Sequence, residues 1–282
     1  MKINLHTHTD YSIDGTISVR GLIKAANKER FEYFSITDHD SVLAYYDEGT
    51  NEPFNGRLIT GLEADALVED VTIEILGYNF DLDKVNQWCL KTYGTRESRQ
   101  RAIYDELGKL CDDLRIKRDT SLKFREGEQF AHDCIYHQLL SASPEWLESH
   151  NITSVSELYR AGTTDQKFPL FIDMNKFWPT IEEVVSVIKE AGGLTFLAHP
   201  FNFKKVDTNW LLDKTKDLVD GIEIFNWKQD AEQTKFLYDY AKKHNLLMSL
   251  GSDYHGEGKN ALLKYDVDPM YEAEALKWLE KI

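Results

Sequence analysis

Short apolar runs alternate with amphipathic segments along most of the chain. Segments in which apolar residues recur every three to four positions, as at 18–30, 182–191 and 231–244, predict helices. Apolar runs predict strands at residues 3–5, 33–37, 58–64, 71–76, 194–198, 222–225 and 246–250. This alternation is typical of βα units, in which helices connect the strands of a mostly parallel sheet. The sequence therefore predicts an α/β fold.

The pattern changes between residues 83 and 165. Residues 85–115 and 129–140 combine helical spacing with many charges, and no strand-like run interrupts them. We therefore expect residues 1–82 and 166–282 to form a barrel core. Residues 83–165 are expected to be a helical insertion that covers the barrel mouth.

Composition and charge narrow the classes of function. Hydrophobic residues make up 42% and charged residues 29% of the 282 residues, as in ordinary soluble globular proteins. The chain has 33 Lys and Arg against 48 Asp and Glu, which gives a net charge of −15. This charge repels a polyphosphate backbone, so long nucleic acids are not expected as partners. A small acidic substrate is compatible with it where carboxylates hold metal cations.

The cysteines and the first residues bear on the location of the protein. Cys89, Cys111 and Cys134 are odd in number and widely spaced, so we expect no disulfide framework. The first ten residues lack the apolar stretch of a signal peptide, and no apolar run approaches the ~18 residues of a membrane helix. We expect a cytoplasmic protein that has no membrane partner.

Polar side chains follow five of the predicted strands, at the point where each strand ends. In a barrel of parallel strands, these carboxyl ends open on one mouth. We therefore expect five of the nine histidines and at least three carboxylates to lie close together. The motifs are His6-Thr7-His8, Thr37-Asp38-His39-Asp40, Gly61-Leu62-Glu63, Ala198-His199-Pro200 and Gly251-Ser252-Asp253-Tyr254-His255.

These residue types point to metal ions. Side chains alternate along a strand, so His6 and His8 project to the same side. Imidazoles combined with carboxylates suit Zn²⁺, Mn²⁺ or Fe²⁺ better than Mg²⁺ or Ca²⁺. One ion takes roughly four to six ligands, so eight or nine ligands imply two or three divalent ions. Adjacent ions can hold the attacking and the leaving oxygen during a hydrolysis.

The segments HTHTDYSIDG, TDHD, GLE, AHP and GSDYH resemble, in this order, the motifs of the PHP family, named for polymerase and histidinol phosphatase. The resemblance extends from residue 2 to about residue 268 and is weakest in the helical insertion. It implies a distorted (β/α)₇ TIM-like barrel with an inserted helical subdomain. It also implies a metal-dependent phosphoesterase with up to three metal ions.

The resemblance further implies a set of ligands for each ion. The first ion would be held by His6, His8, Glu63 and Asp253, the second by Glu63, Glu74 and His199, and the third by Asp14, His39 and His255. Glu74 departs from the family, in which the corresponding strand carries His-Ile-Leu-Gly. Alternation along the strand still lets Glu74 point into the barrel, where it would favour a harder ion such as Mn²⁺.

Substrate contacts are also expected to differ from those of the family. Close relatives carry an arginine soon after Ala-His-Pro and another in the insertion, where both look like phosphate clamps. Here Lys204 and Lys205 follow the strand end, and His132 stands where the arginine of the insertion would be. With Arg99 of the insertion, they are the candidate substrate-binding residues. A solvated helix face is the alternative interpretation of Arg99.

Three residues are predicted to be catalytic. Glu63 and His199 would act while holding metal ions, and Asp40 would protonate the leaving group. Capping of the segment that follows it is an equally good interpretation of Asp40. Glu223 also points into the barrel or a helix interface, and it would at most support the ligands from behind.

The predicted function is hydrolysis of small phosphomonoesters or nucleotides by a hydroxide formed at the metal ions. One alternative is a 5′-3′ exonuclease on short oligonucleotides, in which Trp178 or Phe203 would stack on bases. Histidinol phosphatase is another. A non-catalytic metal-binding module is the alternative outside enzymes.

Overall fold

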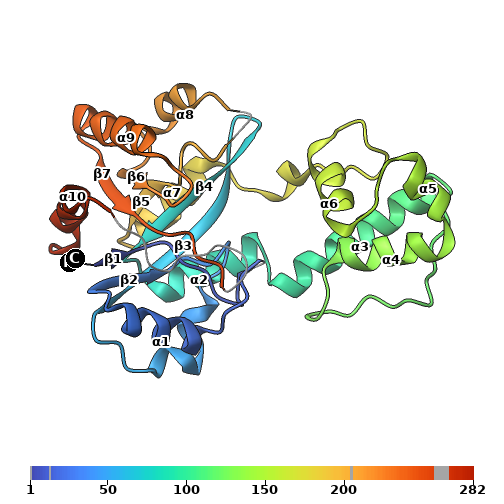
Figure 1. Ribbon diagram of the computed structural model, residues 1–282, viewed down its shortest axis with the longest axis horizontal. Helices are drawn as coiled ribbons and strands as arrows, with labels where there is room; N and C mark the ends of the chain where they lie inside the picture. Colours follow the sequence, from blue (N-terminus) through green and yellow to red (C-terminus); the bar gives the residue numbers. More distant parts are fainter. Residues whose placement is uncertain (1, 13, 204–205, 257–266) are drawn as a thin grey trace. The chain divides into compact units, whose positions relative to one another are not determined.

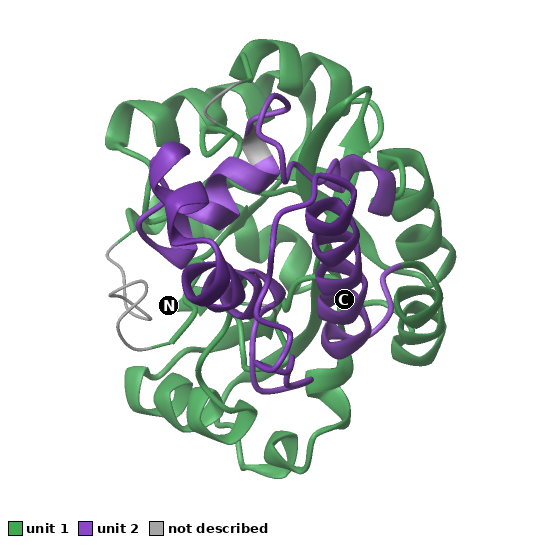
Figure 2. Ribbon diagram, turned by 90° about the vertical axis from the view of Figure 1, so that its right-hand side faces the viewer, with its two compact units in different colours: residues 1–92, 178–282 green, residues 93–177 purple. Residues whose placement is uncertain are grey.

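The computed structural model describes residues 2–12, 14–203, 206–256 and 267–282 (Figure 1). The chain divides into two compact units. The first contains residues 1–92 and 178–282, and the second contains residues 93–177 (Figure 2).

The described part of the first unit contains a seven-stranded sheet whose order follows the chain. Its strands are β1 (Ile3–Asn4), β2 (Tyr33–Ile36), β3 (Arg57–Val68), β4 (Val71–Tyr78), β5 (Leu194–Leu197), β6 (Gly221–Phe225) and β7 (Leu247–Leu250). Leu5 N donates to Leu250 O at 3.1 Å and Asp253 N donates to His6 O at 2.9 Å, which brings β7 back to β1. The sheet is therefore a nearly closed barrel, and the predicted α/β barrel is confirmed.

One strand departs from the parallel arrangement. β4 pairs antiparallel with both β3 and β5, whereas the other neighbouring strands are parallel. Only Glu69 and Asp70 separate β3 from β4, and Glu69 has a left-handed backbone with φ of 55°. A two-residue turn can join antiparallel strands only, because parallel strands need a long crossover. The hairpin places Glu63 and Glu74 on adjacent strands.

Helices surround the barrel of the first unit. They are α1 (Val19–Glu29), α2 (Leu82–Thr92), α7 (Ile181–Glu190), α8 (Thr208–Thr215), α9 (Ala231–His244) and α10 (Pro269–Leu279), with short 3₁₀ turns η1 (Leu43–Tyr46) and η2 (Glu48–Asn51). Tyr78, Phe196 and Trp278 pack together in a buried cluster that joins α10 to the strands. Tyr78 OH also donates to Leu5 O at 3.0 Å, which fixes the strand end that leads into His6.

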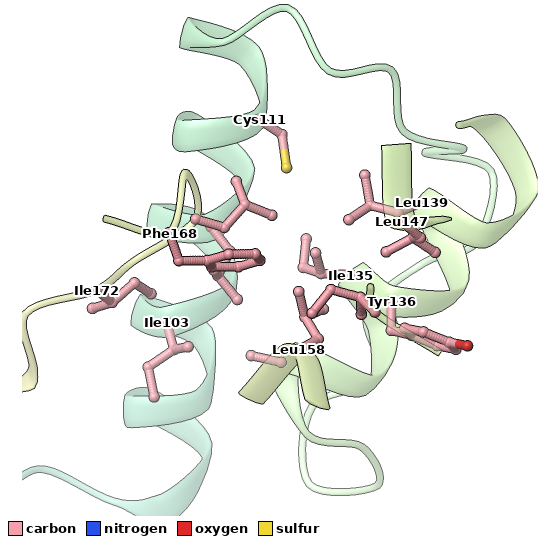
Figure 3. Packing of buried hydrophobic residues seen from close by; sticks show 13 residues of the cluster. Ile103, Cys111, Ile135, Tyr136, Leu139, Leu147, Leu158, Phe168 and Ile172 are labelled. Atoms are coloured by element: carbon pink, nitrogen blue, oxygen red, sulfur yellow. The ribbon is translucent and has the colours of Figure 1, made fainter. Parts of the chain in front are cut away.

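The second unit is helical and has a core of its own. It contains α3 (Arg96–Asp113), α4 (Ala131–Ala142), α5 (Pro144–Ser149), α6 (Val155–Thr164) and the 3₁₀ turn η3 (Met174–Phe177). Figure 3 shows buried side chains of α3, α4 and α6, among them Ile103, Ile135 and Leu158, packed around Phe168.

The second unit begins and ends about ten residues later than the insertion expected at residues 83–165. α2 packs against α7 and belongs to the first unit. Phe168, Leu170 and Ile172 belong to the core of the second unit, so it continues to residue 177. Its role in covering the barrel mouth remains a prediction.

In the described part of the chain, no helix is both long and apolar enough to cross a lipid bilayer. Cys89, Cys111 and Cys134 are all buried. The cytoplasmic location expected from them remains a prediction.

Candidate metal centre

The candidate ligands lie where strands of the barrel end or pair. β1 leads into His6 and His8, β2 into His39, β5 into His199, and β7 into Asp253 and His255, while Glu63 and Glu74 lie within β3 and β4. Backbone bridges between Thr7 and Tyr254 and between His39 and Glu63 hold neighbouring strand ends together. His199 and Asp253 have positive φ angles, of 20° and 52°. Strained backbone of this kind clusters at functional sites.

His6, His8, Glu63 and Asp253 form a buried group whose ligand atoms are evenly spaced. The Nε2 atoms of the two histidines are 3.1 Å apart. They lie 3.1 and 3.2 Å from Glu63 Oε2, and 3.5 and 3.3 Å from Asp253 Oδ1. Ligands of a tetrahedral ion, at about 2.0–2.1 Å from the metal, are about 3.3 Å from one another. The four atoms are thus spaced as ligands of one ion would be.

The surroundings of the Glu63 carboxylate indicate that the group of His6, His8, Glu63 and Asp253 fits a cation. Glu63 Oε2 is buried and makes no hydrogen bond among the described residues, although His39 Nδ1 is also only 3.4 Å away. A buried carboxylate oxygen without compensation is costly, and a metal ion would remove that cost. The donor set of imidazoles and carboxylates therefore fits a divalent transition metal.

Glu63 also belongs to a second group. Its other oxygen, Oε1, lies 3.0 Å from His199 Nε2, and Glu74 Oε2 lies 3.3 Å from the same nitrogen. Glu63 thus offers one oxygen to each of two groups, as a bridging ligand does. Asp65 is the register partner of Glu74 across the β3–β4 hairpin and forms a further group with His39 and Glu74. Asp65 is not among the ligands expected from the sequence.

Asp14, His39 and His255 form a third group, together with His8. Asp14 Oδ2 lies 3.0 Å from His255 Nε2, and Asp14 Oδ1 lies 3.9 Å from His39 Nε2. Ser12 Oγ donates to Asp14 Oδ1 at 3.1 Å, which orients this carboxylate. The structure therefore brings together all nine residues that were expected to hold metal.

Two further carboxylates hold the ligands in position. Glu223 Oε1 lies 2.9 Å from His6 Nδ1, and Glu223 Oε2 accepts a hydrogen bond from His199 N at 2.9 Å. Asp38 accepts hydrogen bonds from the backbone and hydroxyl of Thr9, which fixes the loop after β1. A carboxylate on the second nitrogen of a ligating histidine sets the tautomer and the ring orientation.

The carboxylates dominate the electrostatics of the group. Burial opposes protonation of His8, but the neighbouring carboxylates of Asp253 and Glu63 raise its pKa to about 9. Burial also lowers the pKa of His199, but Glu74 and Glu63 outweigh this effect and raise it to about 9. Burial and the charge of Glu63 raise the pKa of Glu74. Without metal, His8, His199 and Glu74 therefore bind protons more tightly than usual, because the group carries an excess of negative charge.

A cavity of about 410 Å³ opens on these residues, within the size range of small-molecule sites. Its lining includes the carboxylates of Asp14, Glu63, Glu74 and Asp253, but Lys228 is the only lysine or arginine among its described residues. Asn202 and Phe203, which follow β5, also line it. Lys228 was missed because the loop after β6 lacks histidine and carboxylate motifs, although it too follows a strand end.

Other candidates occupy different surroundings. The structure buries Asp40 outside the cavity lining, and its Oδ1 accepts a hydrogen bond from Asp65 N at 2.8 Å. In the second unit, burial lowers the pKa of His132 to about 4, so it is uncharged near neutral pH. Arg99 lies in α3 of the same unit. Lys204 and Lys205 lie outside the described residues.

The fold and the site define a class of hydrolases that work with metal ions in a small barrel. Residues 4–195 match the model of the PHP domain. The chain is 26% identical to the 5′-3′ exoribonuclease Rnm of Salmonella typhimurium, over 89% of this chain and 84% of the relative. It is 23% identical to a 3′,5′-nucleoside bisphosphate phosphatase of Chromobacterium violaceum, over 91% of this chain and 88% of the relative.

A solved structure is also similar along its whole length. A protein of Bifidobacterium adolescentis assigned as a metal-dependent phosphoesterase shares 25% identity and superposes with a TM-score of 0.68. The match covers 98% of this chain and 96% of that protein. The chain belongs to the PHP domain family, and it is an enzyme of the metal-dependent phosphoesterase class.

Metal binding should release protons. His8 and His199 ligate only as neutral imidazoles, but their pKa values of about 9 keep them protonated at neutral pH in the metal-free protein. The apparent affinity for Zn²⁺ should therefore rise with pH between about 7 and 9 and level off above it. Calorimetry of Zn²⁺ binding, in buffers with different ionisation enthalpies, measures both the affinity and the proton count. Equal affinity at pH 7 and pH 9, with no proton release, would contradict the raised pKa values of His8 and His199.

Proposed function

We propose that the protein hydrolyses small phosphomonoesters or nucleotides with two or three divalent ions, which are Mn²⁺, Zn²⁺ or Fe²⁺. The observation that carries this proposal is the position of Glu63, which presents one carboxylate oxygen to each of two neighbouring ligand groups. Two adjacent ions on a shared carboxylate are a common arrangement in enzymes that cleave phosphate esters. The cavity volume of about 410 Å³ suits a substrate of small size.

The residues have separate tasks in this proposal. The first ion would be held by His6, His8, Glu63 and Asp253, the second by Glu63, Glu74 and His199, and the third by Asp14, His39 and His255. Bound divalent ions supply Lewis acidity to phosphoryl oxygens and lower the pKa of water from about 15.7 toward 7. Glu223 orients the ring of His6 in the first group and holds the backbone of His199 in the second.

The source of the leaving-group proton is a separate part of the proposal. Asp40 remains a candidate, but its carboxylate accepts a hydrogen bond from Asp65 N, which ties the side chain to β3. Direct proton transfer from Asp40 would require that hydrogen bond to open. Water in the cavity is the simpler proton source.

A 5′-3′ exonuclease acting on short oligonucleotides is the second candidate function. The similarity to an exoribonuclease favours it. Phe203 lines the cavity, with its ring centroid 5.7 Å from that of His199, and a base could stack on this ring. The net charge of −15 favours short substrates over long ones.

Hydrolysis by the metal-loaded protein tests the function directly. Protein reconstituted with Mn²⁺, Zn²⁺ or Fe²⁺ should hydrolyse nucleotides or other phosphomonoesters. Glu63→Gln should reduce the rate at least about a hundredfold, since even residues behind a metal ligand change activity about 10–100-fold. The exposed Glu190→Gln is the control and should retain full activity.

The substrate screen separates the candidate functions. It compares nucleoside bisphosphates, histidinol phosphate and 5′-phosphorylated oligoribonucleotides, and the highest kcat/KM identifies the class. No hydrolysis of any ester by protein with verified metal content would contradict the proposal. Less than one ion per folded chain after reconstitution would favour the non-catalytic module.

The carboxylate of Glu74 should set the metal preference of the second group. An imidazole is a softer ligand than a carboxylate, so Glu74→His should raise the ratio of bound Zn²⁺ to bound Mn²⁺. Elemental analysis after dialysis against both ions measures this ratio. Glu69→His, on the exposed turn of the same hairpin, should leave it unchanged. An unchanged ratio in Glu74→His would show that Glu74 does not ligate metal.

A further inference from the structure

Lys228 lies in the cavity of the metal centre, on the loop that follows β6. Its Nζ atom is 3.0 Å from Asp253 Oδ2, while the other oxygen of Asp253 faces His6 and His8. The side chain is 42% exposed, and Nζ also lies 5.6 Å from the centroid of the Trp227 ring. An ammonium has three N–H donors, and a single carboxylate oxygen does not use all of them.

The loop holds this lysine in a defined place. Lys228 N donates to Asn226 Oδ1 at 3.1 Å, and the amide nitrogen of Asn226 lies 3.5 Å from Glu223 Oε2. Gln229 closes the turn, since its side chain accepts from Asn226 N and its backbone donates to Asn226 O. The backbone of Lys228 is therefore tied to the same Glu223 that orients the metal ligands.

The charge balance of the cavity indicates what Lys228 contacts. The described residues that line the cavity include four carboxylates. Lys228 is the only lysine or arginine among these lining residues. A phosphate monoester is a dianion near neutral pH, so it needs more positive charge than the carboxylates leave available. An ammonium group binds phosphate as a point charge with several donors.

We propose that Lys228 is a substrate-binding residue whose ammonium group contacts a non-bridging oxygen of the phosphoryl group. This inference rests on the proposed function, because it assigns the phosphate-recognising cation of the same site. Asp253 positions the ammonium beside the ligand group of the first ion. Lys228 thereby selects doubly charged phosphate monoesters over singly charged phosphodiesters.

The test measures binding of inorganic phosphate and turnover of p-nitrophenyl phosphate by the full-length, metal-reconstituted protein. Lys228→Met should weaken phosphate binding in calorimetry and raise KM, each by about 10–100-fold, as expected for loss of a charged hydrogen bond. Metal content and melting temperature should stay unchanged. Lys228→Arg should restore most of the affinity, because it keeps the charge.

Lys216→Met is the matched control. Lys216 also pairs with an aspartate, Asp213, at 2.8 Å, but this pair lies on the surface at the end of α8. Its removal should leave phosphate affinity and KM at wild-type values. Bis(p-nitrophenyl) phosphate provides a second control, since the Lys228→Met effect on its KM should be smaller than on the monoester.

Two results would overturn the inference while leaving the proposed function intact. One is wild-type phosphate affinity and KM in Lys228→Met. The other is loss of bound metal in Lys228→Met, which would show that Lys228 only stabilises Asp253 as a ligand. Failure of the proposed function is distinguishable from both, because the wild-type protein itself would then hydrolyse no phosphate ester.

Discussion

The buried carboxylate of Glu63 is the group on which the rest of the centre depends. Its oxygens face nitrogen atoms of His6, His8, His39 and His199, which come from the ends of three different strands. A carboxylate so deeply buried, with an oxygen that accepts no hydrogen bond from any residue that the structure describes, requires cations nearby. The closed barrel brings the strand ends together, and metal ions are the cations that this donor set fits.

The alternation of strand and helix patterns predicted an α/β fold, and the resemblance to the PHP family implied the barrel, but neither revealed the direction of β4. A run such as 71–76 shows the same alternation whether its neighbours are parallel or antiparallel. The direction follows from the length of the connection, which is two residues. The expected start of the second unit was too early for a related reason. The apolar face of α2 does not show on which of the two cores the helix packs.

The metal centre could be predicted in larger part, because His-x-His and similar motifs at strand ends stand out in a chain of ordinary composition. The supporting residues were harder to find. Asp65 and Lys228 carry no distinctive spacing, and their proximity to Glu74 and Asp253 arises only when β3 pairs with β4 and the loop after β6 folds back. Of the predicted substrate contacts, His132 is buried and uncharged near neutral pH, so its chemistry differs from that of an arginine clamp.

The central claim is that Glu63 joins adjacent metal sites, and anomalous X-ray scattering tests it most directly. Crystals grown with Mn²⁺ and measured at the manganese edge should show at least two peaks that both contact Glu63. One should lie among His6, His8 and Asp253, and the other should lie beside His199. Peaks confined to other parts of the molecule, with none in contact with Glu63, would contradict the account.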